Sequence, residues 1–191
     1  MPTEAGLNVV ATLKSRASVG RLTEPAPAGD DLRLILEAAA RAPDHGKMKP
    51  WRFFTIQGEA RARLGDLMAD TLARREPASD ANALDRERQK PLRAPLLLGV
   101  GAKVVDNGRI PVIEQVLAAG AAAQNALLAA HALGYGGVWR TGDAVYDDAL
   151  KAAFGLAPAD ALLGFLYLGT PVQPQAFSGT VEVSVTEWTG A

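Results

Sequence analysis

Cysteine is absent from the 191-residue chain, and histidine occurs only at positions 45 and 131. The lack of cysteine excludes disulfides, thiolate metal sites and thiol nucleophiles. Two histidines are too few for a histidine-rich metal site, so no metal is expected. The chain also has no Gly-x-Ser-x-Gly motif, and its serines lack an evident histidine partner in the sequence, which argues against a hydrolytic triad.

An excess of positive charge is missing as well. Lys and Arg number 20 against 21 Asp and Glu, which leaves a net charge of −1. No bulk positive field attracts nucleic acid or an anionic membrane, so neither is expected as a partner. Residues 1–8 lack the basic start and apolar core of a secretory signal. The apolar stretch 116–130 is too short and too polar for a membrane span. These features predict a cytoplasmic protein.

The composition is that of a globular chain, with 48% hydrophobic and 21% charged residues. At this length one domain over residues 1–191 is expected. Hydrophobic periodicity and turn residues predict a mixture of helices and strands. Helices are expected over residues 7–17, 31–42, 59–75, 112–133 and 144–154, and strands over 53–56, 96–100, 138–141 and 162–168. Because no glycine-rich phosphate loop follows an early strand, the predicted fold class is α+β.

Four local features add to this prediction. Asp30 or Asp31 is expected to cap the second helix. Asp147 and Asp148 are expected as a charge pair at a helix N-terminus. Residues 76–90, rich in charge and turn formers, are expected to form a mobile excursion or lid. The apolar helix 112–133 and the alternating valines of the extended segment 181–185 lack local partners, which predicts a homodimer in which the tail reaches across.

Three clusters of residues could bind a ligand. The first runs from Ser15 to Ser18 and includes Arg16, with Arg21 nearby. A guanidinium beside hydroxyls suits a phosphate, because it offers a fork of donors. The alternative is a solvated basic helix end that interacts favourably with the helix dipole.

The second cluster runs from Arg41 to Trp51, between a helix and a strand, and prolines restrict its backbone. Arg41, His45, Lys47 and Lys49 offer donors to an anionic or carbonyl-rich ligand on a loop held by rigid elements. The alternative is an ordinary loop with surface charges, in which His45 caps a helix.

The third cluster, residues 134–142, contains four glycines around Trp139, Arg140 and Thr141. Glycines allow the backbone to approach a flat or phosphorylated ligand closely. The spacing differs from a dinucleotide fingerprint, and the segment follows a helix rather than a strand. The alternative is a helix stop and a tight turn, with His131 as a packed or capping residue.

The order of these clusters resembles the nitroreductase family of FMN-dependent oxidoreductases, and in particular its short bacterial branch of NAD(P)H nitroreductases. The resemblance covers residues 13–171, most of the chain. Each matching segment alone is weak, and their common order makes the resemblance strong. The matching segments are residues 16–18, 21–27, 42–45, 48–51, 136–142 and 164–171.

The resemblance implies a nitroreductase-like α+β fold, with a central, mainly antiparallel sheet flanked by helices, in an intertwined homodimer with two FMN sites shared between subunits. It implies that Arg16, Ala17 and Ser18 hold the ribityl phosphate region. It implies flavin contacts from Arg41 and His45 of the same subunit and from Trp139, Arg140 and Thr141 of the other subunit. Residues 129–134 correspond to a region assigned to nicotinamide nucleotide binding.

The implied function is reduction of nitroaromatic, quinone or similar acceptors by NAD(P)H in a ping-pong cycle, with no catalytic side chain. Arg16, Lys47 or Lys49 would supply positive charge near the flavin. Two departures from the family stand out. The family's second arginine is Ala17 here. Many members also have a basic residue near the C-terminus, whereas residues 181–191 contain no Lys or Arg, which leaves that role to Arg140. The alternatives are a dehalogenating or flavin-destroying enzyme on the same scaffold, and a non-catalytic flavin-binding protein.

Overall fold

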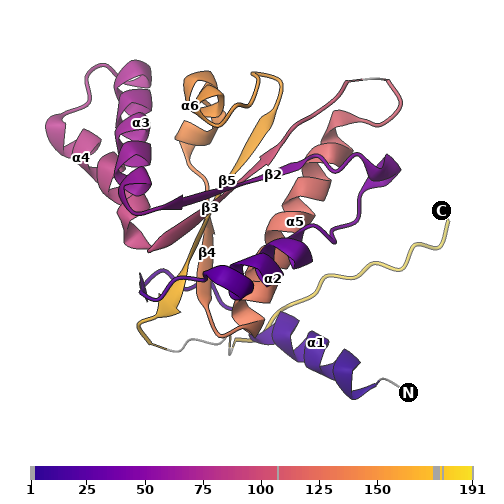
Figure 1. Ribbon diagram of the computed structural model, residues 1–191. Coiled ribbons are helices and arrows are strands. Elements are labelled where there is room, and N and C mark those ends of the chain that lie inside the picture. Colours follow the sequence, from indigo (N-terminus) through magenta and orange to yellow (C-terminus); the bar gives the residue numbers. More distant parts are fainter. Residues whose placement is uncertain (1–2, 107, 174–176, 178, 191) are drawn as a thin grey trace.

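The computed structural model describes residues 3–106, 108–173, 177 and 179–190. Five strands form one antiparallel sheet in the order β1-β5-β3-β2, and β4 pairs with β5 beyond the residues that pair with β1. Helices cover the sheet on both faces (Figure 1). The strands are β1 (Leu22–Thr23), β2 (Trp51–Gln57), β3 (Leu96–Ala102), β4 (Gly136–Arg140) and β5 (Ala161–Pro171). The antiparallel sheet flanked by helices confirms the predicted α+β class.

Strands β3 and β5 form the centre of the sheet and separate two apolar cores. Along each strand alternate side chains point to opposite faces. Leu96, Leu98 and Leu166 belong to one core, whereas Leu97 and Phe165 belong to the other. All seven β3 residues are buried. This burial on both faces explains why the predicted strands 96–100 and 162–168 are continuous apolar runs rather than alternating ones.

The helices divide between the two faces of the sheet. Helices α2 (Gly29–Ala39) and α5 (Val112–Ala132) pack on the first core, and α3 (Glu59–Arg75) and α6 (Asp148–Ala153) pack on the second. Helix α4 (Ala81–Gln89) lies against α3, and α1 (Glu4–Ser15) lies at the C-terminal end of α5 (Figure 1). Short 3-10 helices span His45–Lys47, Lys90–Arg93 and Asp143–Tyr146.

Helix α5 is longer and more apolar than the stretch 116–130, on which the prediction about a membrane span was based. It has 21 residues, and an 18-residue window within it has a mean hydropathy of 1.2, which satisfies the length and composition of a membrane span, so the prediction that the apolar stretch is too short was wrong. One face of α5 is nevertheless buried in the protein, including Ala119, Ala122 and Ala126. Ile113 and Leu117 on other faces are 62% and 64% exposed in the single chain. The burial is that of a core helix with a second apolar surface left open.

The prediction of a mobile excursion over residues 76–90 was wrong. Asp80 accepts a hydrogen bond from Ala83 N at 2.7 Å and so caps α4. Helix α4 then packs tightly on α3, because a Cβ at Gly65 would lie 2.4 Å from the carbonyl oxygen of Arg88. The turn-forming residues of this segment make a helix–turn–helix connection rather than a lid.

Two helix predictions also need correction. Helix α2 begins at Gly29, and its N-cap is Ala28, which makes no side-chain capping bond. Asp30 and Asp31 lie in the first turn instead, where carboxylates favour the helix dipole. The predicted helix 144–154 is two elements, a 3-10 helix and α6, because Asp147 has extended backbone angles and caps α6. The expected acidic pair at the start of α6 is confirmed.

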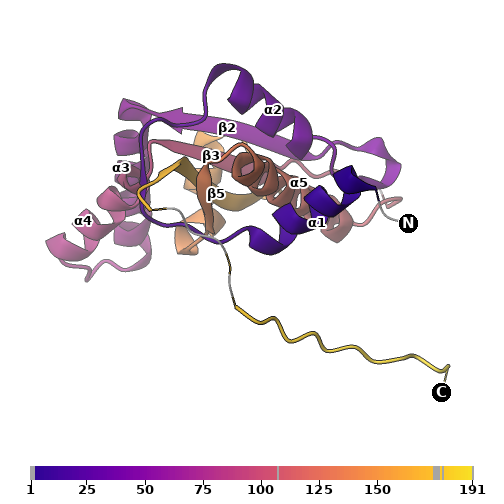
Figure 2. The same cartoon turned by 90° about the horizontal axis from the view of Figure 1, so that it is seen from below.

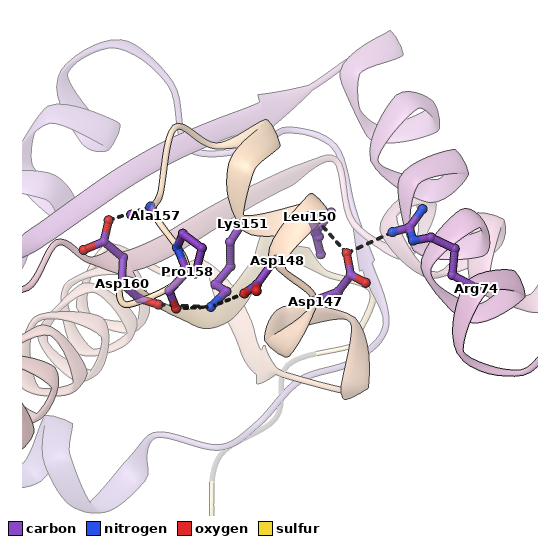
Figure 3. Close-up of polar contacts among 8 residues, drawn as sticks. All are labelled: Arg74, Asp147, Asp148, Leu150, Lys151, Ala157, Pro158 and Asp160. Carbon is purple, nitrogen blue, oxygen red and sulfur yellow. Dashed lines mark hydrogen bonds and ion pairs between the residues drawn. The ribbon is translucent and has the colours of Figure 1, made fainter.

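Asp147 joins this corner of the fold to α3 (Figure 3). Its Oδ1 atom accepts hydrogen bonds from Leu150 N and from Arg74 Nη2, each at 2.9 Å. Nearby, the nearly buried Lys151 donates to the Pro158 carbonyl at 2.6 Å and pairs with Asp148 at 2.8 Å. Burial alone would raise the pKa of Asp147, but the bonds from Leu150 and Arg74 outweigh it and hold that pKa below its ordinary value of 3.8.

We expect Asp147→Ala to lower the free energy of unfolding by about 1 kcal/mol, because α6 loses its cap. For a chain of this size the melting temperature then falls by roughly 2–4 °C. Asp147→Asn keeps a capping side chain and removes only the charge. Because the folded-state pKa is lowered, the charge stabilises the protein above pH 3.8, and this contribution disappears as the pH falls through the folded-state value.

Denaturant unfolding of the wild type and Asp147→Asn between pH 7 and pH 3 measures this contribution. The two proteins should differ in stability at pH 7 and converge at the acid end. A difference that stays constant over this range would contradict the assigned role of the Asp147 charge.

An apolar surface is left open on α1 and the tail. Leu7, Val9, Val10 and Leu13 on α1 are each about half exposed or more. The tail carries exposed Val181, Val183 and Val185, and Trp188 is 86% exposed. Residues 179–190 form no helix or strand and run away from the body as an extended segment (Figure 2). Burial of such large apolar side chains requires a partner surface.

Candidate functional site

A half-open cavity of about 500 Å³ lies where the end of α1, the last turns of α5 and the end of β5 meet. Its wall is mostly apolar, with a few polar groups, as is common in small-molecule sites of this size. We call it the Arg16 cavity. It is lined by Arg16, Ala17, Val19, Leu127, His131, Gly134, Tyr135, Gly136, Gly137, Thr170 and Pro171.

Arg16 enters this cavity directly after the end of α1. Its backbone N–H caps the helix by donating to Thr12 O at 3.2 Å. Within the described part of the chain, its guanidinium has no hydrogen-bond or ion-pair partner. Its five donors are therefore free to bind an anion in the cavity. Of the other predicted phosphate contacts, Ala17 lines the cavity and Ser18 is exposed beside it.

Residues 16–20 are tied to β4 of the same chain. Val19 N donates to Gly137 O at 3.0 Å. A Cβ built on Gly20 would lie 3.3 Å from Arg140 Nη2, so the Arg140 guanidinium covers this glycine. Arg140 also lies over the Tyr167 ring, with 5.7 Å between Cζ and the ring centroid. The first and third predicted clusters are therefore neighbours within one subunit.

Trp139 and Thr141 are placed by an irregularity in β5. Trp139 is half-buried, and its Nε1–H donates to Leu163 O at 2.9 Å. The register of β5 against β3 shifts at this point, and Gly164 has a φ of +118°. A Cβ at Gly164 would lie 2.5 Å from Arg140 O and 3.1 Å from Thr141 Cγ2. The glycine is required so that residues 139–141 can lie closely against β5.

Gly136 and Gly137 have a different role from the one predicted. They do not end α5, because Gly134, with a φ of +89°, follows that helix, and Gly136 already belongs to β4. A Cβ at Gly136 would lie 2.9 Å from Pro171 Cγ. A Cβ at Gly137 would lie 2.9 Å from Leu168 and 3.0 Å from Leu127. These glycines let β4 pack closely against neighbouring side chains, and they also line the Arg16 cavity.

The second predicted cluster forms a strained loop at the other end of the molecule. Lys47 and Lys49 have φ values of +55° and +47°, which non-glycine residues rarely adopt and which often mark functional sites. Asp44 Oδ2 accepts a bond from Lys49 N at 2.6 Å, and His45 Nδ1 lies 2.5 Å from Glu114 Oε2. In the described chain, the side chains of Arg41, Lys47 and Lys49 have no polar partner.

The predicted clusters lie at opposite ends of α5. His45 contacts Glu114 in its first turn, whereas the Arg16 cavity includes His131 in its last turn. Seventeen helical residues at about 1.5 Å each separate Glu114 from His131, which is about 25 Å. In Figure 1 the short helix before β2 lies near one end of α5 and α1 lies at the other. The expectation that His45 joins Arg16 at one flavin of the same subunit therefore has no support from the geometry. Arg41, also expected there, lies nearer, three residues after Ala38, whose carbonyl oxygen accepts from Asn125 Nδ2 of α5 at 3.3 Å.

Three cavity residues were not singled out as site residues from the sequence, although His131 lies in the stretch 129–134, Tyr135 in the third cluster and Thr170 in the matching segment 164–171. His131 was taken as a packing residue, but its Nε2 lies 3.0 Å from Ser15 Oγ and its ring lines the cavity. Tyr135 donates its hydroxyl to Asp31 Oδ2 at 2.7 Å, and Thr170 donates to Pro25 O at 2.8 Å. The hydrogen bond to Asp31 is the main cause of a raised pKa of Tyr135, and burial and the Asp31 charge add to it. Each of these three residues lies more than 100 residues from its hydrogen-bond partner, so local sequence patterns could not predict the contacts.

Comparison with known proteins adds a family assignment. A model of the Nitroreductase family matches residues 13–170. The Escherichia coli (strain K12) protein named "Putative NAD(P)H nitroreductase YdjA" is 42% identical over 165 residues, covering 86% of this chain and 89% of the relative. A Haemophilus influenzae protein named "Putative NAD(P)H nitroreductase" is 34% identical over 168 residues, covering 87% of this chain and 90% of the relative.

Solved structures share the fold. A nitroreductase-like family protein from Bacillus cereus has a TM-score of 0.78 and 26% identity, covering 95% of this chain and 96% of that chain. A "putative nitroreductase in complex with fmn" from Desulfovibrio desulfuricans has a TM-score of 0.68 and 30% identity, covering 91% of each chain.

Proposed function

Because the chain belongs to the nitroreductase family, we propose that it is an FMN-dependent oxidoreductase that uses NAD(P)H to reduce nitroaromatic, quinone or similar acceptors in ping-pong order. The names of the relatives support the nucleotide, and a 30% identical relative solved with FMN supports the cofactor. We take residues 1–191 as one domain that works in the cytoplasm.

The observation that carries this proposal is the Arg16 cavity. FMN has a dianionic phosphate at one end and a flat apolar ring system at the other. The unpartnered guanidinium of Arg16 suits the phosphate, and the mostly apolar wall suits the rest of the ligand. The donor set therefore fits FMN, and Arg16, Ala17 and Ser18 would hold its phosphate region. Arg140, beside Gly20, places a second guanidinium next to this segment.

We propose that each site is completed by a second copy of the chain. The half-exposed apolar residues of α1, the open face of α5 and the tail together provide an apolar surface of the kind that obligate dimers bury. A groove of about 960 Å³ between α1 and the tail is lined partly by Leu13, Phe177 and Val181. In such a dimer the tail can cross to the partner.

The geometry favours a different division of the site residues between the two subunits from the one expected from the sequence. Residues 16–18 and 139–141 are neighbours in one chain and would serve one flavin together. His45 lies about 25 Å of helix away from His131. Arg41 lies between the two ends of α5, three residues after Ala38, whose carbonyl oxygen accepts from Asn125 Nδ2 at 3.3 Å. His45 would therefore reach the flavin of the partner subunit. The strained loop with Lys47 and Lys49 would then face that flavin as well.

Bound FMN would supply the redox chemistry by accepting hydride from NAD(P)H and passing electrons to the acceptor. The protein binds and orients it. Arg16 would anchor the phosphate, and Trp139, whose indole N–H is held by Leu163 O, would give residues 139–141 a fixed position. Lys47 and Lys49, whose backbone N–H groups donate to Asp44 O and Asp44 Oδ2, would place positive charge near the flavin ring. No side chain is required as a general base.

Steady-state oxidation of NADH and NADPH, with and without a nitroaromatic or quinone acceptor, tests this function. We expect acceptor-dependent turnover with parallel double-reciprocal plots, the kinetic pattern of a ping-pong reaction. Stoichiometric loss of FMN would indicate a flavin-destroying enzyme, and turnover confined to halogenated substrates a dehalogenating one. Flavin binding without turnover of any acceptor would indicate a flavin-binding protein.

A further inference from the structure

His131 and Ser15 form a polar pair at the wall of the Arg16 cavity. Ser15 ends α1 and His131 lies in the last turn of α5, so the pair joins the two helices that frame the cavity. Ser15 Oγ lies 3.0 Å from His131 Nε2, and both residues are half-buried. Arg16, next to Ser15, lines the same cavity as His131. A histidine and an arginine therefore share one wall.

Ser15 Oγ lies between two hydrogen-bond partners, Thr12 O at 3.3 Å and His131 Nε2 at 3.0 Å. A serine hydroxyl has one hydrogen to donate. When that hydrogen goes to Thr12 O, the serine oxygen can accept from His131 Nε2–H. Nδ1 is left without a partner in the described chain, and the protonated ring could donate a second hydrogen bond from it. Ser15 thus positions the His131 ring and leaves its other nitrogen available.

The surrounding charges suit an anion at this point. Arg16 lines the cavity, and its guanidinium has no polar partner in the described chain. None of the described residues that line the cavity carries a carboxylate, and Asp31, outside the lining, accepts the hydroxyl of Tyr135 at 2.7 Å. His131 also lies in the last turn of a helix, where the dipole favours a cation. A bound anion would therefore meet donors from both Arg16 and His131.

We propose that His131 is a second ligand of the FMN phosphate, with Ser15 as its positioning residue. This inference rests on the proposed function and deepens it. The protonated imidazole donates from Nε2 to Ser15 Oγ and from Nδ1 to a phosphate oxygen. Arg16 and His131 then hold one phosphate between the end of α1 and the end of α5.

Titration of the apoprotein with FMN and with riboflavin, which lacks the phosphate, tests this assignment directly. Each affinity is measured by the change in flavin fluorescence. We expect His131→Gln to lower FMN affinity by about 10-fold, the loss of one charge-assisted hydrogen bond, and to leave riboflavin affinity unchanged. Ser15→Ala should lower the preference for FMN over riboflavin by a smaller factor. It keeps the test available if His131→Gln does not fold.

Lys14→Gln is the matched control, because it removes an exposed charge from the same helix end outside the Arg16 cavity. It should leave the preference for FMN intact. An unchanged preference in folded His131→Gln would overturn the inference, and an accompanying rise in the KM for NADPH would assign this wall to the nucleotide instead. A wild-type protein that binds neither flavin would refute the proposed function itself.

Discussion

Replacement of Arg16 by alanine is expected to weaken FMN binding by about 10- to 150-fold. The change removes a charge-assisted contact to the cofactor phosphate, which contributes about 1.5–3 kcal/mol. The loss should fall on binding rather than folding, because the Arg16 side chain has no polar partner in the described chain and its backbone N–H still caps α1. Equilibrium titration of the apoprotein with FMN measures the effect.

Arg86→Ala serves as the matched control for this substitution. Arg86 is an exposed arginine on α4, which lies on the opposite face of the sheet from the Arg16 cavity. Its removal should leave both FMN affinity and melting temperature unchanged. If Arg16→Ala binds FMN as tightly as the wild type, Arg16 has no place in the cofactor site.

Mixed dimers should reveal which subunit supplies each residue. We expect Arg16→Ala and His45→Ala each to bind FMN poorly as homodimers. In a dimer that contains one subunit of each kind, the proposed allocation puts both changes in one site and leaves the other site intact. Up to half of the sites in mixed dimers should then regain wild-type affinity. Flavin content after subunit exchange, with differently tagged subunits to isolate the mixed species, gives the measurement.

A second pairing makes the allocation falsifiable. Arg16 and Arg140 lie close together in one chain, so a mixed dimer of Arg16→Ala and Arg140→Ala has one change in every site and should not recover. The allocation first inferred from the sequence predicts the opposite result for both pairings. Recovery with Arg140→Ala and none with His45→Ala would therefore contradict the arrangement proposed from the structure.

The sheet and most helices were predictable because their residues carry a local pattern. Helix 59–75 was predicted with its observed ends, and the apolar runs 96–100 and 162–168 are the buried centre of the sheet. The failures lie where one residue type serves two purposes. Asp80 was predicted to lie in a mobile loop but caps α4, and the predicted helix 144–154 begins too early because Asp147, expected near a helix N-terminus, caps α6.

The candidate site was predictable in its parts but not in its assembly. The first and third clusters meet because Val19 pairs with Gly137, and the second is held away by the length of α5. His131 lies 116 residues from Ser15, so the sequence placed it only within the stretch 129–134 and gave no sign of its contact with Ser15. Side chains that become neighbours only through the packing of α1 on α5 leave no local signature.

The absorption spectrum of the FMN-loaded protein under anaerobic conditions is the most direct measurement of the proposed activity. Addition of NADH or NADPH should bleach the visible flavin bands, and a nitroaromatic or quinone should then restore them without further nucleotide. Recovery of the oxidised spectrum in that second, separate step is what a ping-pong reaction requires. A protein that binds no FMN, or one whose bound flavin neither nucleotide reduces, would contradict the proposal that this chain is an NAD(P)H-dependent flavin oxidoreductase.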